Sequence, residues 1–345
     1  MGATLLESRP IERSKVMHWS IRRAIVCVAC TALLTMTSGG YAGDKRECTT
    51  EEEMGADNQL TTIAEDDEKS KELIEQHLPF GQHISRHTAQ GKPTNEQLLV
   101  QGGYVIFHDG DLRTALWTAH RLTRTDVIGG ECKKRVECFR ADKRLPENQA
   151  AREEDYDEPI FDQGHMTSDR DLRDDLTEQV NSYVMSNMSP QYAGFNRGIW
   201  GKLEKLGRVW AKKYKTIYVT SGALFDFNRK DARDKDDAAA RVGTRSQTAR
   251  VAIPSHYYKV FLRSVGERWS TIAFLLNHDN STGSGGRKTM RQRLEDAIKS
   301  LAWIEKRSEL IFHPDLDRSH VDESLNGIGW DFTNRRDKDE SECES

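Results

Sequence analysis

The residues best suited to chemistry lie in one stretch of the chain, Phe161–Glu204. His165 can act as a general base, because imidazole titrates closest to neutral pH. Asn196 offers a neutral amide oxygen, a ligand that suits a hard divalent cation. Asn187 adds a second amide and Glu204 a carboxylate. The stretch therefore holds a base, a cation ligand and an acidic group.

Three expected elements would bring these side chains to one spot. A short apolar run ends in the turn that carries His165, and the β-branched and aromatic run Tyr183–Met188 predicts a strand that ends at Ser189-Pro190. A helix follows, because apolar residues recur there with a period of 3.6: Ile199, Leu203, Leu206 and Trp210. Asn196 lies one turn before this stripe, and Glu204 lies two turns after Asn196.

Each residue also has an ordinary structural explanation. A single histidine such as His165 is more often structural than catalytic. Asn196 before a helix can be an N-cap. Glu204 can pair with Arg208 one turn later. Asn187 at a strand end can serve turn geometry. These alternatives stay open on spacing alone.

Three motifs in this stretch carry a resemblance: D-Q-G-H, S-N-M-S-P-Q and F-N-R-G-I-W-G-K-L-E. They resemble the signature of the DNA/RNA non-specific endonucleases, the ββα-metal or His-Me finger nucleases that include endonuclease G. Residues from roughly 95 to 315 match that family in order. Further blocks of likeness are Leu112–Leu122, Cys138–Arg144, Ile217–Phe225, Val251–Leu262 and Ile304–Phe312.

The resemblance implies a metal-dependent endonuclease that hydrolyses the phosphodiester bonds of DNA and RNA and leaves 5′-phosphate ends. His165 would be the general base. Asn196 would bind the cation, Mg²⁺ with Mn²⁺ or another divalent ion as the alternative. Glu204 would hold a metal-bound water or position the cation, and Asn187 would orient the imidazole or the substrate. Arg140 matches a family arginine that contacts the scissile phosphate.

Gln163 departs from the family pattern. The family sequence is D-R-G-H, and its arginine helps to neutralise the transition state. Glutamine offers two amide donors but carries no charge and no guanidinium fork. We therefore expect either a slower nuclease or a protein that binds nucleic acid without cleaving it. An extracellular interaction protein that uses the fold only as a scaffold is a third reading. Because His165 and Asn196 are both present, the sequence favours the enzyme.

The fold expected is α+β with a largely antiparallel central sheet, the ββα-metal fold, because strands occur in runs with few helices between them. The strand-like runs are 104–107, 114–119, 216–220, 251–262 and 271–276, and helices are expected at 195–214 and 289–308. We divide the chain into a signal peptide (1–42), an acidic segment (43–77), the endonuclease domain (78–314) and an acidic tail (315–345).

Charge is distributed unevenly among these parts. The whole chain has a net charge of −4, with +3 over residues 1–42, −8 over residues 43–75 and −6 over residues 315–345, which leaves +7 for residues 76–314. A basic core suits a polyanionic partner, because Lys and Arg contacts to phosphates dominate nucleic-acid affinity. Both acidic ends are expected to be solvated and mobile.

The N-terminus has the pattern of a secretory signal, since Arg22-Arg23 precede an apolar run, Ala24–Thr37, and small residues at Gly40-Tyr41-Ala42. Secretion is expected, without stable membrane association. A mitochondrial presequence is the alternative, because endonuclease G is mitochondrial.

The mature chain would keep an even set of cysteines, which indicates disulfide bonds: Cys48, Cys132, Cys138 and Cys343. Three pairings are open to such a set. We expect Cys132–Cys138, the local pair, and then Cys48–Cys343.

Overall fold

The computed structural model describes residues 45–85, 95–131, 133–225, 251–279, 288–325 and 329–332. Its main strands are β3 (Glu96–Val100), β4 (Val105–Asp109), β5 (Thr114–Thr123), β9 (Thr216–Leu224), β10 (His256–Val265), β11 (Arg268–Asn277), β12 (Ile298–Lys299) and β14 (Val321–Glu323). They form one sheet in the order β12-β11-β10-β9-β5-β4-β3, antiparallel throughout, with β14 added in parallel to β11. The prediction of an α+β fold with a largely antiparallel sheet is confirmed.

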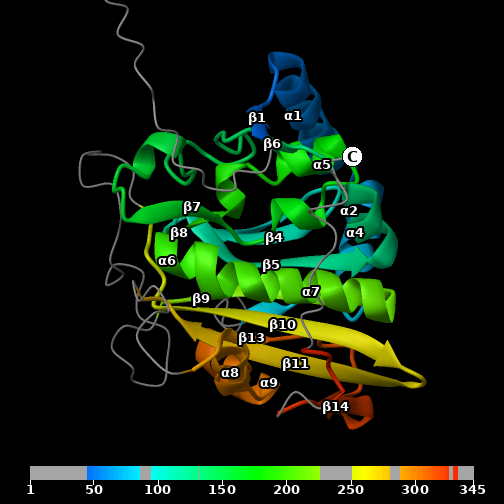
Figure 1. The fold of residues 1–345 in the computed structure, drawn as a ribbon. Coiled ribbons are helices and arrows are strands. Elements are labelled where there is room, and N and C mark those ends of the chain that lie inside the picture. Colours follow the sequence, from blue (N-terminus) through cyan, green and yellow to red (C-terminus); the bar gives the residue numbers. More distant parts are fainter. Residues whose placement is uncertain are drawn as a thin grey trace, which may run out of the picture. The chain divides into compact units, whose positions relative to one another are not determined.

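A second small sheet and a helix carry the candidate residues. β7 (Phe161–His165) pairs antiparallel with β8 (Met188–Tyr192). The chain then continues through α6 (Ala193–Phe195), a π-helical turn (Asn196–Trp200) and α7 (Gly201–Tyr214). The backbone leaves helical geometry at Gly198 (φ −99, ψ −108), so the helix is kinked between Asn196 and Glu204. In Figure 1, α7 runs alongside β5 and β9, with β7 and β8 above them. This is the ββα arrangement expected from the motifs.

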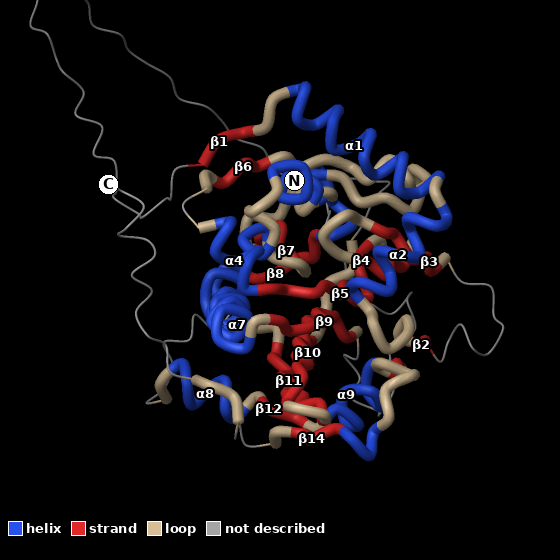
Figure 2. Tube along the Cα trace, turned by 90° about the vertical axis from the view of Figure 1, so that its right-hand side faces the viewer, coloured by secondary structure: helices blue, strands red, loops and turns tan. Residues whose placement is uncertain are grey.

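Helices cover both faces of the main sheet. Figure 2 views that sheet nearly edge-on, with α7 on one side and α9 on the other. The helix bounds are α1 (Thr50–Glu65), α2 (Asp67–His77), α4 (Arg124–Gly130), α5 (Leu176–Asn181), α8 (Met290–Asp296) and α9 (Leu301–Ser308). Short 3-10 turns lie at Glu153–Asp155, Asp169–Asp171, Met185–Asn187 and Arg318–His320. Two short strands, β2 (Ile84–Ser85) and β13 (Leu310–Ile311), pair with each other.

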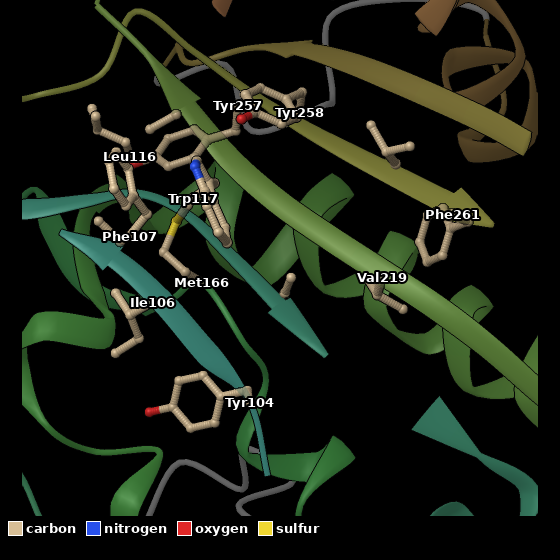
Figure 3. Close-up of a cluster of buried hydrophobic side chains, with 14 of the residues drawn as sticks. Tyr104, Ile106, Phe107, Leu116, Trp117, Met166, Val219, Tyr257, Tyr258 and Phe261 are labelled. Atoms are coloured by element: carbon tan, nitrogen blue, oxygen red, sulfur yellow. The ribbon is translucent and has the colours of Figure 1, made fainter. Parts of the chain in front are cut away.

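The main core lies between the sheet and the segments packed on it (Figure 3). Phe107 of β4 stacks on Trp117 of β5 with ring centroids 5.4 Å apart. Met166, the residue directly after His165, is fully buried in the same cluster. The turn that carries the candidate base is therefore anchored in the core of the protein.

The acidic N-terminal segment is ordered and packed, so the prediction of a solvated, mobile segment is wrong for residues 45–77. A capping box between Thr49 and Glu52 starts α1. Ala56, Leu60 and Ile63 recur at helical spacing and are buried. The many acidic side chains of this segment, Glu51, Glu52 and Glu53 among them, concealed this apolar stripe.

The start of the C-terminal tail also packs on the sheet. β14 extends β11, and Trp330 is buried. The Arg263 guanidinium lies 5.0 Å from the centroid of the Trp330 indole ring. The prediction of a solvated tail is therefore wrong for these residues, while 333–345 lie outside the described part of the chain.

Three element predictions also differ from the structure. The strand expected at 251–262 begins only at His256, the first residue of β10. The single helix expected at 289–308 is divided into α8 and α9 by β12, which pairs with β11. The strand expected at Tyr183–Met188 begins only at Met188, because residues Met185–Asn187 form a 3-10 turn. Pro190 lies within β8 opposite Gln163 and is tolerated there because β8 pairs with β7 alone among the described strands.

One disulfide is present among the described residues, and it is not a pair that we expected. Cys48 is bonded to Cys138, with their Cα atoms 5.2 Å apart. The pairings Cys132–Cys138 and Cys48–Cys343 are therefore wrong. The parallel pairing of β1 (Lys45–Glu47) with β6 (Arg135–Glu137) brings Cys48 to Cys138. Cys132, Cys343 and the predicted signal peptide all lie outside the described residues.

Candidate active site

His165 is the last residue of β7, and its side chain is almost completely buried. The Tyr183 ring meets the imidazole edge to face at a centroid distance of 4.7 Å, and the Phe139 ring lies 6.3 Å away. Burial lowers the pKa of His165 to about 4, against the opposing effect of the Asp169 carboxylate. The imidazole is therefore neutral near pH 7 and able to accept a proton. Its Nε2 atom is buried and has no hydrogen-bond partner in the described part of the chain.

Hydrogen bonds hold the backbone around His165 rather than its ring. The Trp200 Nε1–H donates to the carbonyl of His165 at 3.1 Å. The Asn187 amide bonds twice to Thr167, accepting from its N–H and donating to its carbonyl, both at 3.0 Å. Asn187 also donates to the Ser182 carbonyl at 2.8 Å and is fully buried. Asn187 thus fixes the turn that follows His165 and makes no hydrogen bond to the imidazole.

Asn196 stands at the junction of α6 and the π-helical turn. It is not the N-cap of either helix, since Tyr192 and Trp200 occupy those positions. Its Nδ2 donates to the Asp162 carboxylate of β7 at 2.9 Å. Arg197 donates to the same carboxylate from Nε and Nη2, at 2.9 and 2.7 Å. The amide nitrogen is engaged by Asp162, while the Oδ1 atom of Asn196 accepts no hydrogen bond from the described residues. A free amide oxygen of this kind is a suitable ligand for a hard cation.

Glu204 lies in the first turn of α7 and is partly exposed. The expected alternative, an ion pair with Arg208, is not formed, because Arg208 pairs with Asp171 at 2.8 Å instead. Burial raises the pKa of Glu204 to about 7, while the cations of Lys259 and Arg208 oppose that rise. Glu204 makes no hydrogen bond or ion pair within the described residues, so its carboxylate is open to a water or a cation.

Lys259 is a buried cation that sequence reasoning missed. It comes from β10, and its Nζ atom lies 4.1 Å from the Trp200 ring centroid. It donates to Ser221 Oγ at 2.5 Å and to the Met166 carbonyl at 3.4 Å. Burial lowers the pKa of Lys259 to about 8, and Glu204 opposes that change. A lysine inside the apolar run Val251–Leu262 was the only signal that could have drawn attention to it.

Gln163 and His165 share one face of β7, because side chains alternate along a strand. Gln163 is partly exposed, and its amide makes no hydrogen bond to the described residues. Gly164 faces the other way, toward Gln191. A Cβ atom on Gly164 would lie 2.3 Å from the Gln191 side chain, so only glycine fits there. The D-Q-G-H motif thus places Gln163 on the same face of β7 as His165. The glycine of the motif is explained by its close packing against Gln191.

Arg140 is not brought to this site as a free donor. Its guanidinium is buried and donates to the Asp57 carboxylate at 2.7 Å and to Asn181 Oδ1 at 2.6 Å. Two further bonds go to the carbonyls of Val180 (2.9 Å) and Cys138 (3.2 Å). A guanidinium with these partners stabilises the fold. Its contact with the scissile phosphate stays a prediction.

A family model described as DNA/RNA non-specific endonuclease matches residues 84–319, more than half of the chain. The chain belongs to this family. A solved chain from the crystal structure of the EndoG/EndoGI complex shares the fold, with a TM-score of 0.58, 22% identity and coverage of 72% of this chain and 95% of that one.

Curated relatives of this endonuclease family member are nucleases by name. Identity is 30% over 229 residues to Nuclease C1 of Cunninghamella echinulata var. echinulata, covering 66% of this chain and 86% of the relative. Identity to mitochondrial endonuclease G of Homo sapiens is 30% over 172 residues, covering 50% of this chain and 56% of the relative. Identity to mitochondrial nuclease EXOG of Danio rerio is 27% over 218 residues, covering 63% of this chain and 61% of the relative. The chain thus spans about three fifths of the last two. No helix in the described part of the chain is long and apolar enough to cross a membrane.

Proposed function

We propose that this chain is a metal-dependent endonuclease that hydrolyses phosphodiester bonds of DNA and RNA with little sequence preference. The observation that carries the proposal is the joint fixing of His165 and Asn196 by β7. His165 ends this strand, while Asp162 of the same strand orients the Asn196 amide. Membership of the DNA/RNA non-specific endonuclease family supports the substrate class.

In this proposal, His165 accepts the proton of the attacking water. Because Nε2 is buried, Nδ1 is the nitrogen that meets that water. Asn196 Oδ1 would hold a divalent cation, Mg²⁺ or alternatively Mn²⁺, a kind of ion that needs few protein ligands. A cation bound there supplies positive charge to the phosphate and the departing oxygen. Glu204 would hold a water or position the cation, and Asn187 keeps the His165 turn rigid.

Gln163 supports a second candidate, a protein that binds nucleic acid without cleaving it. The family arginine is absent at this position, and the nearby guanidiniums are engaged elsewhere. Arg173 pairs with Asp169 at 2.8 Å, and Arg197 pairs with Asp162. We favour the enzyme because the base and the cation ligand are both retained, and a site that had lost its activity would be expected to lose one of them.

We also propose that the protein is secreted. The pattern of residues 1–42 supports this, and so does the Cys48–Cys138 disulfide, since such bonds persist in oxidising compartments. Mitochondrial import is the alternative that the relatives' names suggest. Expression of a tagged full-length chain decides between them. Tagged protein in the medium, with its N-terminus near residue 43, supports secretion, and tag in the mitochondrial fraction contradicts it.

The function is tested by incubating the purified protein with plasmid DNA and with RNA, each with Mg²⁺ and with a chelator. We expect cleavage of both substrates with Mg²⁺ only, and loss of cleavage in His165→Ala and Asn196→Ala at equal folded concentration. His320→Ala is a matched control, because within the described residues this exposed histidine bonds to its neighbours Asp317 and Ser319 alone. Absence of metal-dependent cleavage by the wild type, with nucleic acid still bound, would establish the second candidate instead.

A further inference from the structure

The segment Lys45–Glu65 lies before the residues that match the endonuclease family, yet it is firmly joined to them. β1 pairs in parallel with β6, and the Cys48 N–H donates to the Glu137 carbonyl at 2.9 Å. The Cys48–Cys138 disulfide makes this join covalent. In α1, Asp57 accepts from Arg140 at 2.7 Å and from Lys143 at 2.6 Å.

Behind this join lies a small buried cluster that is separate from the main core. Its members come from the N-terminal segment and the endonuclease domain together: Ala56, Val136, Cys138, Val180 and Tyr183, with Cys48 and Phe139 packed against them. Tyr183 and Phe139 are also the two aromatic rings that face the His165 imidazole. The small buried cluster behind the disulfide and the aromatic wall of His165 therefore share two side chains, those of Tyr183 and Phe139.

A polar chain of contacts follows the same route. Lys45 of β1 pairs with Glu137 of β6 at 3.0 Å, and Glu137 contacts Arg135 at 3.2 Å. Arg135 Nε donates to the Tyr183 hydroxyl at 2.6 Å. The guanidinium of Arg135 also lies 5.6 Å from the centroid of the Tyr183 ring. β6 is therefore joined through Arg135 to the ring that lies on His165.

We propose that the disulfide-tethered N-terminal segment is a positioning element of the active site, which holds Tyr183 and Phe139 against the His165 imidazole. This inference rests on the proposed function, because it takes His165 as the base. It makes Tyr183 a positioning residue that acts through His165. It also makes a segment outside the family match necessary for full nuclease activity.

Loosening the aromatic wall would change the pKa of His165. The charged groups that face His165 are Asp169 and Arg173 beyond β7, and Arg135 and Glu137 on β6. Burial is the largest cause of the low pKa of His165. Loosening the wall admits water, so the pKa of His165 rises from about 4 toward its ordinary value of 6.5. Because the base must be neutral to act, the acidic limb of the kcat/KM profile then moves to higher pH.

The direct test is the double variant Cys48→Ser/Cys138→Ser, compared with the oxidised wild type well below both melting temperatures. We expect kcat to fall by about tenfold to a hundredfold with KM little changed, since small misplacement of a catalytic group has effects of this size. The pKa of His165, followed by NMR of its ring protons without metal, should rise. Unchanged kcat and unchanged pKa in the folded double variant would overturn the proposal.

Should that variant fail to fold, Tyr183→Leu tests the wall itself. Tyr104→Leu is its matched control, because Tyr104 is also fully buried and donates its hydroxyl to a carbonyl, that of Asn181, at 2.9 Å. We expect a raised pKa of His165 and a lower kcat in Tyr183→Leu alone. Equal effects in both variants would show a general loss of stability and overturn the proposal. The NMR readout needs no cleavage, so it separates this inference from a failure of the proposed nuclease function.

Discussion

The His165 imidazole is almost completely buried against the Tyr183 and Phe139 rings, whereas the Asn196 amide is partly exposed and is oriented by one carboxylate, that of Asp162. The backbone around His165 is fixed from several elements, including Trp200 of the π-helical turn and Asn187 of the 3-10 turn. The two halves of the site thus differ in rigidity and in access to water.

This difference corresponds to the two chemical tasks that we propose. A base must be neutral and accurately placed, and burial provides both conditions for His165. A ligand of Mg²⁺ must leave room for the waters that the ion retains, and Asn196 has that room. Disrupting the rigid half should therefore cost stability and activity together, while disrupting the open half should cost activity alone.

The largest effect is expected for Asn187→Ala in the rigid half. The change removes three hydrogen bonds and leaves backbone groups of Thr167 and Ser182 unpaired in the core. Each such group costs about 1–3 kcal/mol, so we expect a loss of roughly 3–5 kcal/mol in the free energy of unfolding. Urea denaturation measures it, with the exposed Asn58→Ala in α1 as control. A loss no larger than that of the control would show that the turn is held without Asn187.

A smaller effect, confined to activity, is expected for Asp162→Asn in the open half. The Asn196 amide loses its charged acceptor and can rotate, and a hydrogen bond to a charged group is worth about 1.5–3 kcal/mol. We expect kcat to fall by about tenfold to a hundredfold and more Mg²⁺ to be needed for half-maximal cleavage. Titration of cleavage with Mg²⁺ measures both.

The control for Asp162→Asn is Arg197→Gln, which breaks the exposed ion pair with Asp162 but leaves the bond to Asn196. Exposed pairs contribute at most about 1 kcal/mol, so its effect should stay below about fivefold. If Arg197→Gln were as damaging as Asp162→Asn, the charge of Arg197 would be the important feature, not the orientation of Asn196.

The smallest effect is expected for Gln163→Arg, and it is a gain. Gln163 shares the face of β7 that carries His165, so an arginine there could reach the phosphate that meets the base. We expect kcat to rise by about tenfold with substrate binding similar. Single-turnover cleavage of one oligonucleotide by both proteins decides this. An equal or slower variant would mean that the position has acquired another role.

The ββα region could be predicted from the sequence because its motifs are local and chemically specific. The apolar stripe of α7 and the D-Q-G-H turn can each be recognised from neighbouring residues, without knowledge of distant contacts. Asn187, by contrast, was expected at the end of a strand, and its role in the turn depends on Thr167 and Ser182, which only the fold brings near. Lys259 was missed for the same reason, since its partners come from β9, the β7 turn and α7.

The amino-acid composition of the N-terminal segment led to a wrong prediction. Its many acidic residues indicated a solvated chain, yet Ala56, Leu60 and Ile63 are buried where α1 packs on the domain. The Cys48–Cys138 bond follows from the β1–β6 pairing, a long-range contact that no local spacing reveals. Arg140 was assigned to phosphate binding from a motif, but its partner Asp57 comes from this same segment.

The most direct test of the central claim is chemical rescue of His165→Ala. This variant should lose about 10²- to 10⁴-fold in Mg²⁺-dependent plasmid cleavage, the usual contribution of a general base. Added imidazole should restore part of the rate, because the change leaves a space beside Tyr183 of the size of the lost ring. Asn196→Ala, which retains the base, should not respond to imidazole. Wild-type cleavage by His165→Ala, or equal stimulation of both variants, would contradict the assignment of His165 as the base.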